Sequence, residues 1–407
     1  MPPRTIDFWF DYTCPYAYLA STQVEALARR TGATLTWKPM LLGGVFRAVS
    51  TPQKLFATLS PPKAHHNALD LDRQAELFDV TLVMPAGHPF RSVEALRATL
   101  ATGCDPRVIH GFYRAYWVEG REISSPGVMR DVLASAGYDP EAVLAKITDE
   151  AIKDELRRRT DEAIALGIFG APAFVVDGAR LYWGQDRMHF VEGLRYNPDA
   201  SPPPRDRLMA HTLEIYWDFS SPFSYLGATQ AEAVAARTGA NLVWRPMLLG
   251  GVFKAIGQVT VPLQTWSAAK QQYTLKDMSD WAAYWDVPFK FPSRFPTNSL
   301  KAMRAYLALP EERRQDYRER VYRAYWAEDR DIADDSVLGE IIGNDAAEVL
   351  ARAQSPEVKQ SLIDATQRAV EAGVFGAPTW VIDGRDLYWG QDRLALVERA
   401  LTRGARE

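Results

Sequence analysis

Short apolar runs rich in β-branched and aromatic residues recur along the chain, and segments of helical periodicity follow them. IDFWF (6–10) and LEIYW (213–217) are two such runs, so both are predicted to be strands. Pro15 and Pro222 open the segments that come next. Proline is tolerated in the first turn of a helix, where its missing N–H would be unsatisfied anyway. A helix is therefore expected to begin at each of these prolines.

The rest of the pattern has the same order in both halves of the chain. It predicts a helix stop at Thr-Gly, a second strand, a long helical stretch, a hairpin around Asp-Gly and a last helix. In the first half these features are, in order, Thr31-Gly32, ATLTWKP, about 50–166, 174–183, and Gln185 to about Arg195. In the second half they are Thr238-Gly239, ANLVWRP, about 257–372, 380–389, and Gln391 to about Thr402. This order is the thioredoxin plan with a helical domain inserted in its middle, so the predicted fold class is α/β.

The two halves repeat each other in sequence. TGATLTWKPMLLGGVF (31–46) returns as TGANLVWRPMLLGGVF (238–253), and so long a period indicates two domains rather than a solenoid. Prolines between them cannot continue a helix or a central strand. We predict a first domain at 1–198, a proline-rich linker at 199–207 and a second domain at 208–407.

Composition and charge narrow the class of protein. The 407 residues carry a formal net charge of −4, which argues against a nucleic-acid or anionic-membrane surface. No apolar run approaches the roughly 20 residues of a membrane span, and MPPRTIDFWF has no stretch typical of a secretory signal. Cys14 and Cys104 are the only cysteines and match no disulfide framework or zinc spacing. We expect a reduced, cytoplasmic protein without a metal.

The turn between the first strand and the first helix of each half is a candidate for chemistry. Unpaired N–H groups and the helix dipole favour an anion there, so Cys14 is expected to ionise more easily than an ordinary thiol. Ser221 stands at the equivalent position, and its hydroxyl can donate a hydrogen bond to the thiolate of another molecule. A plain N-cap is the alternative role for both residues.

Two further stretches would meet this turn in a thioredoxin plan. Ala171-Pro172 and Ala377-Pro378 precede the hairpins, and an X-Pro bond turns cis at a cost of only about 0.5–1 kcal/mol. A cis bond would leave the backbone of the alanine free to pair with an extended ligand, whereas the alternative is a proline that merely starts a strand.

The motif Gly-Gln-Asp-Arg follows each hairpin. N–H groups at the helix start, at Gln185 and Gln391, suit a carboxylate, and Asp186 and Asp392 suit an ammonium group. The pair fits a ligand with an α-amino acid end. The alternative is that these aspartates only interact with the helix dipole.

Dithiol redox chemistry of the thioredoxin kind is excluded, because it needs two thiols and neither the Cys14 turn nor the Ser221 turn has more than one.

Five motifs of the second half stand in one order: SPFSYL (221–226), WRP (244–246), FPTN (295–298), FGAP (375–378) and WGQDR (389–393). Together they resemble the 2-hydroxychromene-2-carboxylate isomerases, close relatives of the kappa-class glutathione transferases in the DsbA-like branch of the thioredoxin superfamily. The resemblance covers nearly all of both halves. It implies two tandem thioredoxin-like domains, each with a large helical insertion.

The resemblance also implies glutathione as cofactor. In the family, the serine at the Ser221 position hydrogen-bonds the glutathione sulfur, the residue before the cis-proline (Ala377) pairs with its backbone, and the aspartate matching Asp392 binds its γ-glutamyl amine. Asn298 would lie near the thiol. The implied reaction is an isomerisation in which the thiolate opens a chromene ring, a bond rotates, and elimination returns glutathione.

The first half departs from the family at two positions. Cys14 replaces the serine, and Arg91 stands where the second half has Asn298. Such a cysteine could form a mixed disulfide with glutathione or act as the nucleophile, and the arginine could hold a substrate carboxylate or repel a cation. The second half is therefore the better candidate for activity.

Other residues have two interpretations each. Lys38 and Arg245, between Trp and Pro in the second strands, face either solvent or the pocket and are hypothesised to bind a substrate carboxylate. Aromatic residues at helical spacing are predicted to be core, though they could floor an aromatic pocket: Tyr113, Tyr116, Trp117, Tyr322, Tyr325 and Trp326.

Three hypotheses of function remain. The first is a glutathione-dependent isomerase, or a kappa-class-like transferase, that acts on a small aromatic carboxylate. The second is a monothiol enzyme centred on Cys14. The third is that one or both halves are degenerate and structural, and that the tandem chain acts as a covalent pseudo-dimer.

Overall fold

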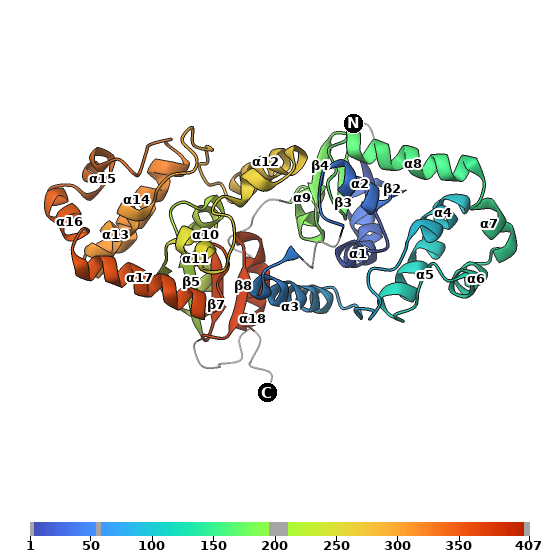
Figure 1. The fold of residues 1–407 in the computed structure, drawn as a ribbon, viewed down its shortest axis with the longest axis horizontal. Helices are drawn as coiled ribbons and strands as arrows, with labels where there is room; N and C mark the ends of the chain where they lie inside the picture. The colour runs from blue at the N-terminus through green and yellow to red at the C-terminus, as the bar shows by residue number, and fades with distance from the viewer. Residues whose placement is uncertain (1–3, 54–57, 195–210, 403–407) are drawn as a thin grey trace. The chain divides into compact units, whose positions relative to one another are not determined.

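A computed structural model describes residues 4–53, 58–194 and 211–402, and each half of the chain forms a four-stranded sheet with helices packed around it (Figure 1). The predicted linker, 199–207, lies outside the described residues. The fold class predicted from the sequence is confirmed, because both halves have the thioredoxin order with helices inserted between the second and third strands.

The two sheets have the same topology. Their strand orders are β2-β1-β3-β4 and β6-β5-β7-β8, with the first pair of strands in each half parallel and the other pairs antiparallel. The strands are β1 (Thr5–Phe10), β2 (Thr34–Pro39), β3 (Ala173–Val176), β4 (Arg180–Trp183), β5 (Thr212–Trp217), β6 (Asn241–Pro246), β7 (Thr379–Ile382) and β8 (Asp386–Trp389).

The helices also correspond between the halves. In the first half they are α1 (Pro15–Thr31), α2 (Leu42–Ala48), α3 (Pro61–Leu77), α4 (Val93–Ala101), α5 (Pro106–Trp117), α6 (Pro126–Ser135), α7 (Pro140–Lys146), α8 (Glu150–Ala165) and α9 (Met188–Glu192). In the second half they are α10 (Pro222–Thr238), α11 (Leu249–Ala255), α12 (Ala268–Tyr284), α13 (Leu300–Ala308), α14 (Glu311–Trp326), α15 (Asp335–Ile342), α16 (Ala346–Arg352), α17 (Pro356–Glu371) and α18 (Leu394–Thr402).

The first helix of each half begins and ends where the sequence predicts. Pro15 and Pro222 occupy the first turns of α1 and α10. Gly32 and Gly239 follow these helices in the left-handed conformation, with φ of 64° and 68°. Glycine adopts this conformation without the clash that a Cβ would cause, so both helices stop there.

The hairpins are confirmed, but the last helices begin later than predicted. Asp177 and Gly178 both have positive φ, 52° and 70°, and the N–H of Ala179 donates to the Val176 carbonyl oxygen, at 3.2 Å. These are the features of a type I′ turn at the tip of the hairpin. After the hairpins, η2 (Gln185–Arg187) and η4 (Gln391–Arg393) form 3₁₀ turns before α9 and α18 begin. A left-handed glycine, Gly193, then ends α9 earlier than the predicted Arg195.

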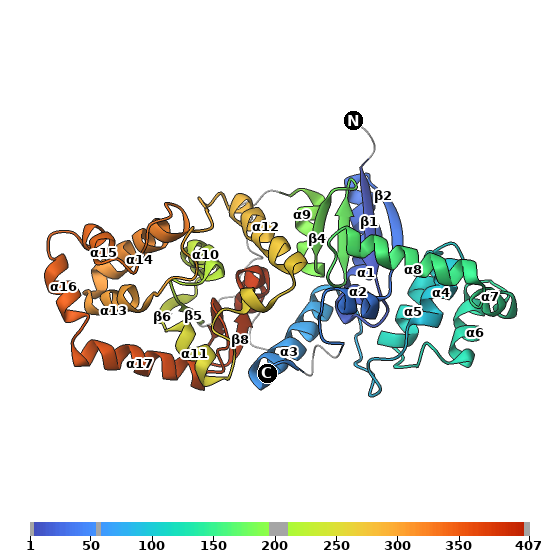
Figure 2. The ribbon, with the colours of Figure 1, turned by 45° about the horizontal axis from the view of Figure 1, so that its top comes forward.

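The helices divide between the two faces of each sheet. In the second half, the face of β5 that carries Tyr216 packs against Val252 of α11 and Ala369 of α17. The other face carries Trp217, which contacts Tyr306 of α13 and Tyr322 of α14. Figure 2 shows α13 and α14 side by side, with α17 running from these helices to the sheet. The aromatic residues at helical spacing are buried, as predicted.

Residue contacts divide the chain into two compact units that follow the halves except at two short segments. Leu59–Asn67 groups with the unit that holds the second sheet, and Ser267–Tyr273 with the unit that holds the first. The predicted boundaries at 198 and 208 remain predictions. Within the described ranges, every helix is too short or too polar to cross a lipid bilayer.

Gly376 provides a test of how tightly the hairpin packs on the segment before it. A Cβ at this position would lie too close to Nε1 of Trp389. We expect Gly376→Ala to destabilise the protein by about 1–3 kcal/mol, as overpacking does. At Gly250, in α11, an added Cβ makes only ordinary contact with Thr260. Gly250→Ala should be neutral or slightly stabilising. Urea unfolding of the full chain measures both, and equal effects would contradict the predicted clash.

Candidate active site

A buried aspartate organises the turn between the first strand and the first helix of each half. Asp218 is fully buried and accepts hydrogen bonds from the backbone N–H groups of Ser220, at 2.9 Å, and Leu249, at 2.6 Å, and from the hydroxyl of Ser299. Burial raises the pKa of Asp218, although these hydrogen bonds lower it in part. The carboxylate thereby joins the turn to the start of α11 and to the segment before α13.

The first half has the same arrangement around Asp11. Its carboxylate accepts hydrogen bonds from the N–H groups of Thr13, at 3.0 Å, and Leu42, at 2.8 Å, and from the hydroxyl of Ser92. Burial raises the pKa of Asp11 as well. The sequence reasoning missed both aspartates, and the available signal was that Asp recurs at the end of the first strand in DYTCP and DFSSP.

Ser221 lies at the centre of the turn in the second half. Its Oγ accepts a hydrogen bond from the N–H of Ser224, at 3.1 Å, so it caps α10 as the sequence alternative proposed. The same Oγ donates to the carbonyl oxygen of Ala377, at 2.9 Å. The bond between Ala377 and Pro378 is cis. The structure thus brings together Ser221 and the proline segment that the sequence placed beside it.

Cys14 lies in the same place in the first half, but its electrostatics differ from the prediction. Its Sγ–H donates to the carbonyl oxygen of Ala171, at 3.0 Å, and the Ala171-Pro172 bond is cis. Burial raises the pKa of Cys14 to about 12, although the N–H groups of Ala17 and Tyr16 lower it in part. The expectation of an easily ionised thiol is therefore wrong, because desolvation of the thiolate outweighs the helix terminus.

The two turns also differ in a buried tyrosine. In the second half, the Tyr322 hydroxyl donates to Ser224 Oγ, at 3.1 Å, and approaches the Asp218 carbonyl oxygen, at 3.3 Å. In the first half, Ala17 replaces Ser224, and the buried Tyr113 hydroxyl has no hydrogen-bond partner in the described part of the chain. An unsatisfied buried hydroxyl is costly, so the second half keeps the better-satisfied turn.

The tryptophans at the ends of α5 and α14 hold the Cys14 and Ser221 turns in place. Trp326 donates its indole N–H to the carbonyl oxygen of Phe219, at 2.8 Å, and Trp117 donates to that of Tyr12, at the same distance. Both side chains are fully buried. The inserted helices therefore fix the loop that carries Ser221 or Cys14.

The Gly-Gln-Asp-Arg motifs are tied to the proline segments. The N–H of Gly390 donates to the carbonyl oxygen of Pro378, at 3.0 Å, and Gly184 does the same to Pro172. Gln391 and Gln185 are buried. Asp392 pairs with Arg393, at 3.2 Å, and Asp186 pairs with Arg187, at 3.0 Å. The motif thus lies next to the cis-proline, as a thioredoxin plan requires.

In each unit a side chain accepts a hydrogen bond from the backbone N–H of the tryptophan before this motif. In the unit of the second sheet, His66 Nε2 accepts a hydrogen bond from the N–H of Trp389, at 3.1 Å. In the unit of the first sheet, the Tyr273 hydroxyl accepts from the N–H of Trp183, at 2.9 Å. Neither His66 nor Tyr273 was predicted from the sequence. Their positions depend on which unit the segments Leu59–Asn67 and Ser267–Tyr273 join.

Asn298 and Arg91 make local contacts only. Asn298 is exposed, and its Oδ1 accepts a hydrogen bond from the N–H of Leu300, at 3.1 Å, just before α13. Arg91 is exposed and pairs with Glu94, at 2.8 Å. The structure records no contact of Asn298 with Ser221 or of Arg91 with Cys14, so their proposed roles near a ligand remain predictions.

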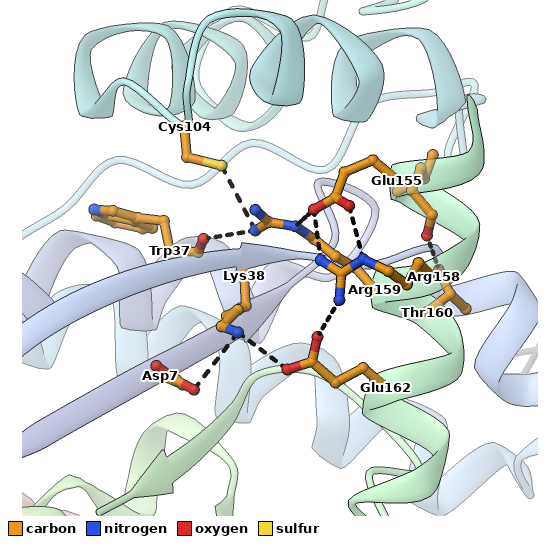
Figure 3. A network of polar contacts seen from close by, with 10 residues as sticks. Asp7, Trp37, Lys38, Cys104, Glu155, Arg158, Arg159, Thr160 and Glu162 are labelled. Atoms are coloured by element: carbon orange, nitrogen blue, oxygen red, sulfur yellow. Dashed lines mark hydrogen bonds and ion pairs between the residues drawn. The ribbon is translucent and has the colours of Figure 1, made fainter. Parts of the chain in front are cut away.

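Lys38 and Arg245 are held in ion pairs on the sheets. Lys38 Nζ lies 3.0 Å from Glu162 and 3.8 Å from Asp7 (Figure 3). Arg245 donates through Nε to Glu214, at 2.7 Å. Neither side chain has a recorded contact with Cys14 or Ser221, so a role as partner of a substrate carboxylate at those turns remains a hypothesis.

Comparison with known proteins agrees with the repeated architecture. A family model described as a DSBA-like thioredoxin domain matches residues 5–194 and 212–402. A 2-hydroxychromene-2-carboxylate isomerase from Sphingobium xenophagum is 30% identical over 193 residues, which are 46% of this chain and 96% of the isomerase. Glutathione S-transferase kappa 1 from Homo sapiens is 29% identical over 211 residues, which are 47% of this chain and 92% of the transferase. A solved structure of a 2-hydroxychromene-2-carboxylate isomerase has a TM-score of 0.43 and 26% identity, and the match covers 46% of this chain and 93% of that one. The similarity indicated by the five motifs is confirmed.

The two buried tyrosines give a matched pair of substitutions. Tyr322→Phe removes a hydroxyl that is hydrogen-bonded, so we expect a loss of about 0.5–1.5 kcal/mol of stability. Tyr113→Phe removes a hydroxyl with no partner, so we expect a neutral or stabilising effect. Urea unfolding of the full-length variants measures both, and equal destabilisation would contradict the difference between the turns.

The raised pKa of Cys14 gives a test by alkylation. At pH 7 the thiol is protonated, and the thiolate fraction rises about tenfold per pH unit until the pH nears the pKa of about 12. In a Cys104→Ser background, iodoacetamide should therefore label Cys14 slowly at pH 7 and faster at each higher pH up to 10. Rapid, stoichiometric labelling at pH 6 would overturn this assignment and support a thiol enzyme.

Proposed function

The chain belongs to the family of DSBA-like thioredoxin domain proteins, and on this premise we propose that it is a glutathione-dependent isomerase of the 2-hydroxychromene-2-carboxylate type. The single observation that carries the proposal is the position of Ser221. Its hydroxyl lies at the N-terminus of α10 and beside the cis bond of Pro378, where a cysteine-based family would place its thiol.

The residues around Ser221 fit a glutathione thiolate by their chemistry. Ser221 supplies a hydroxyl donor, which here donates to the Ala377 carbonyl oxygen. The 17-residue helix α10 adds the positive end of its dipole. No thiol stands in this turn, so the site suits a thiol that a ligand brings.

Several groups of the second half would hold the cofactor. The backbone of Ala377 would pair with its peptide portion, and Gln391 and Asp392 at the start of η4 would receive its α-amino acid end. Asn298 would lie near the sulfur. When bound, glutathione would supply the thiol that adds to the conjugated system of the substrate and leaves it again.

The protein's own groups would act by holding charge and position. The Ser221 hydroxyl proton would favour the anionic form of the ligand. Asp218 would keep the Ser221 turn fixed against α11 through the N–H of Leu249. The buried ring of Tyr322 and its hydroxyl would support Ser224, whose N–H orients Ser221 Oγ.

We propose that the first half is not the catalytic one. Cys14 is a buried, protonated thiol with a pKa of about 12, and Arg91 at the Asn298 position is engaged by Glu94. The monothiol hypothesis therefore loses its physical basis at neutral pH. A structural role of the first half within a covalent pseudo-dimer remains a proposal.

A kappa-class-like glutathione transferase is the second candidate, because the human kappa transferase is nearly as similar to the chain as the isomerase is. Both activities would use the same Ser221 site. They differ in the fate of the thiol, which stays on the product of a transferase and is released by an isomerase. Mass spectrometry of the product separates the two.

Removal of the Ser221 hydroxyl tests the proposal. We expect Ser221→Ala to lower the turnover of a 2-hydroxychromene-2-carboxylate with glutathione by about 10²-fold, as loss of one donor to a reacting anion does. Cys14→Ala, the equivalent change in the first half, should leave turnover nearly unchanged. An unchanged rate for Ser221→Ala, or an equal loss for Cys14→Ala, would contradict the assignment.

A further inference from the structure

The edge of the second sheet carries a cavity that contains none of the Ser221 site residues. Its volume of about 350 Å³ lies in the range of small-molecule sites. The cavity adjoins the edge strand β6, next to α13, the start of α14 and α17. It is lined by Glu214, Tyr216, Trp244, Arg245, Pro246, Tyr306, Leu307, Arg314, Ser361, Asp364, Ala365 and Arg368.

At the equivalent place the first half has a network of long side chains (Figure 3). Arg159 donates to the Trp37 carbonyl oxygen, at 3.3 Å, and to Glu155, at 2.7 Å. Its guanidinium also lies 3.8 Å from Cys104 Sγ, so this cysteine has a partner that the sequence did not predict. Lys38 bridges Glu162 and Asp7 beside it. These side chains occupy the space between β2 and α8.

The sequence repeat shows why this space differs in the second half. GIFGAP begins at 167 and GVFGAP at 373, an offset of 373 − 167 = 206. The helices before them, α8 and α17, therefore match residue by residue. Ser361 stands for Glu155, Ala365 for Arg159 and Arg368 for Glu162. Two long side chains become short ones, and the carboxylate that paired with Lys38 becomes a guanidinium.

The cavity has an excess of positive charge. Three arginines line it against two carboxylates, Glu214 and Asp364. Arg245 is paired with Glu214, and Arg314 donates to the carbonyl oxygens of Leu307 and Leu309. Arg368 has no ion pair or side-chain hydrogen bond to any residue that the structure describes. The guanidinium of Arg368 therefore remains to receive an anion.

Aromatic side chains form part of the wall of the cavity. Tyr216, Trp244 and Tyr306 line it, and flat side chains of this kind favour a flat ring by stacking or edge contacts. A guanidinium binds a carboxylate through two parallel N–H donors. We propose that this pocket binds a small aromatic carboxylate, at a site separate from Ser221 and present in the second half because Ser361 and Ala365 leave it open. The inference does not depend on the proposed isomerase activity.

Refilling the pocket with the side chains of the first half tests the proposal. Isothermal titration of the full chain with salicylate should show binding, and the double variant Ser361→Glu/Ala365→Arg should weaken it by at least about tenfold. Arg368→Ala should weaken salicylate binding to a similar extent without filling the space. Thermal unfolding of each variant checks that the fold is retained.

A matched control changes the same helix away from the cavity. Ile363 of α17 is exposed and does not line the pocket, so Ile363→Arg should leave salicylate binding unchanged. Two further probes separate the need for a ring from the need for a negative charge. Benzamide has the ring without the charge, and inorganic phosphate has the charge without the ring, so both should bind much more weakly than salicylate. Equal salicylate binding by the wild type and the refilled variant, no binding by the wild type, or phosphate binding as tight as that of salicylate would overturn the proposal.

Discussion

The geometry of each candidate site depends on one buried carboxylate. Asp218 and Asp11 are almost completely removed from water, and an ion in that position is tolerated only where hydrogen-bond donors replace its hydration. The donors come from three separate segments: the turn itself, the start of α11 or α2, and the serine before α13 or α4. Because the carboxylate needs all of them, it fixes those segments relative to one another. Ser221 and Cys14 then stand three residues further along the chain, at a place set by this anchor.

The halves keep this anchor and differ in what surrounds it. In the second half, polar groups are satisfied around the turn, with Ser221, Ser224 and Tyr322 linked by hydrogen bonds. In the first half, Cys14 and Ala17 take the places of the serines, and the environment becomes less polar. A less polar environment disfavours a thiolate, so the Cys14 thiol, which looks reactive in the sequence, has a raised pKa in the structure. The two substitutions act together, since each replaces a hydroxyl group of the same turn with a less polar side chain.

Much of the fold was predictable because it depends on local signals. Proline at Pro15 and Pro222, glycine at Gly32 and Gly239, and the Asp-Gly turns each constrain a few neighbouring residues, and each was assigned correctly. The pairing of Ser221 with Ala377 also followed from the order of elements.

The remainder was not predictable because it depends on distant partners and on burial. The anchoring role of Asp218 requires Leu249 and Ser299, which are far from it in sequence. The pKa of Cys14 is set by how deeply the turn is covered, which the sequence of the turn does not contain. Likewise, Arg245 was assigned to a substrate, and the structure shows that its nearest charge is Glu214 on the adjacent strand.

The paired substitutions on α8 and α17 have a consequence for how such a chain can change over time. In an assembly of identical subunits, a mutation that opens a space opens it in every copy and weakens all of them. Here Arg159 and Glu155 keep one copy filled while Ala365 and Ser361 leave the other open. Because both copies are translated as one polypeptide, they are always made in equal amounts and still vary independently. The chain can thus acquire a new surface in one copy while the other copy keeps the same space filled.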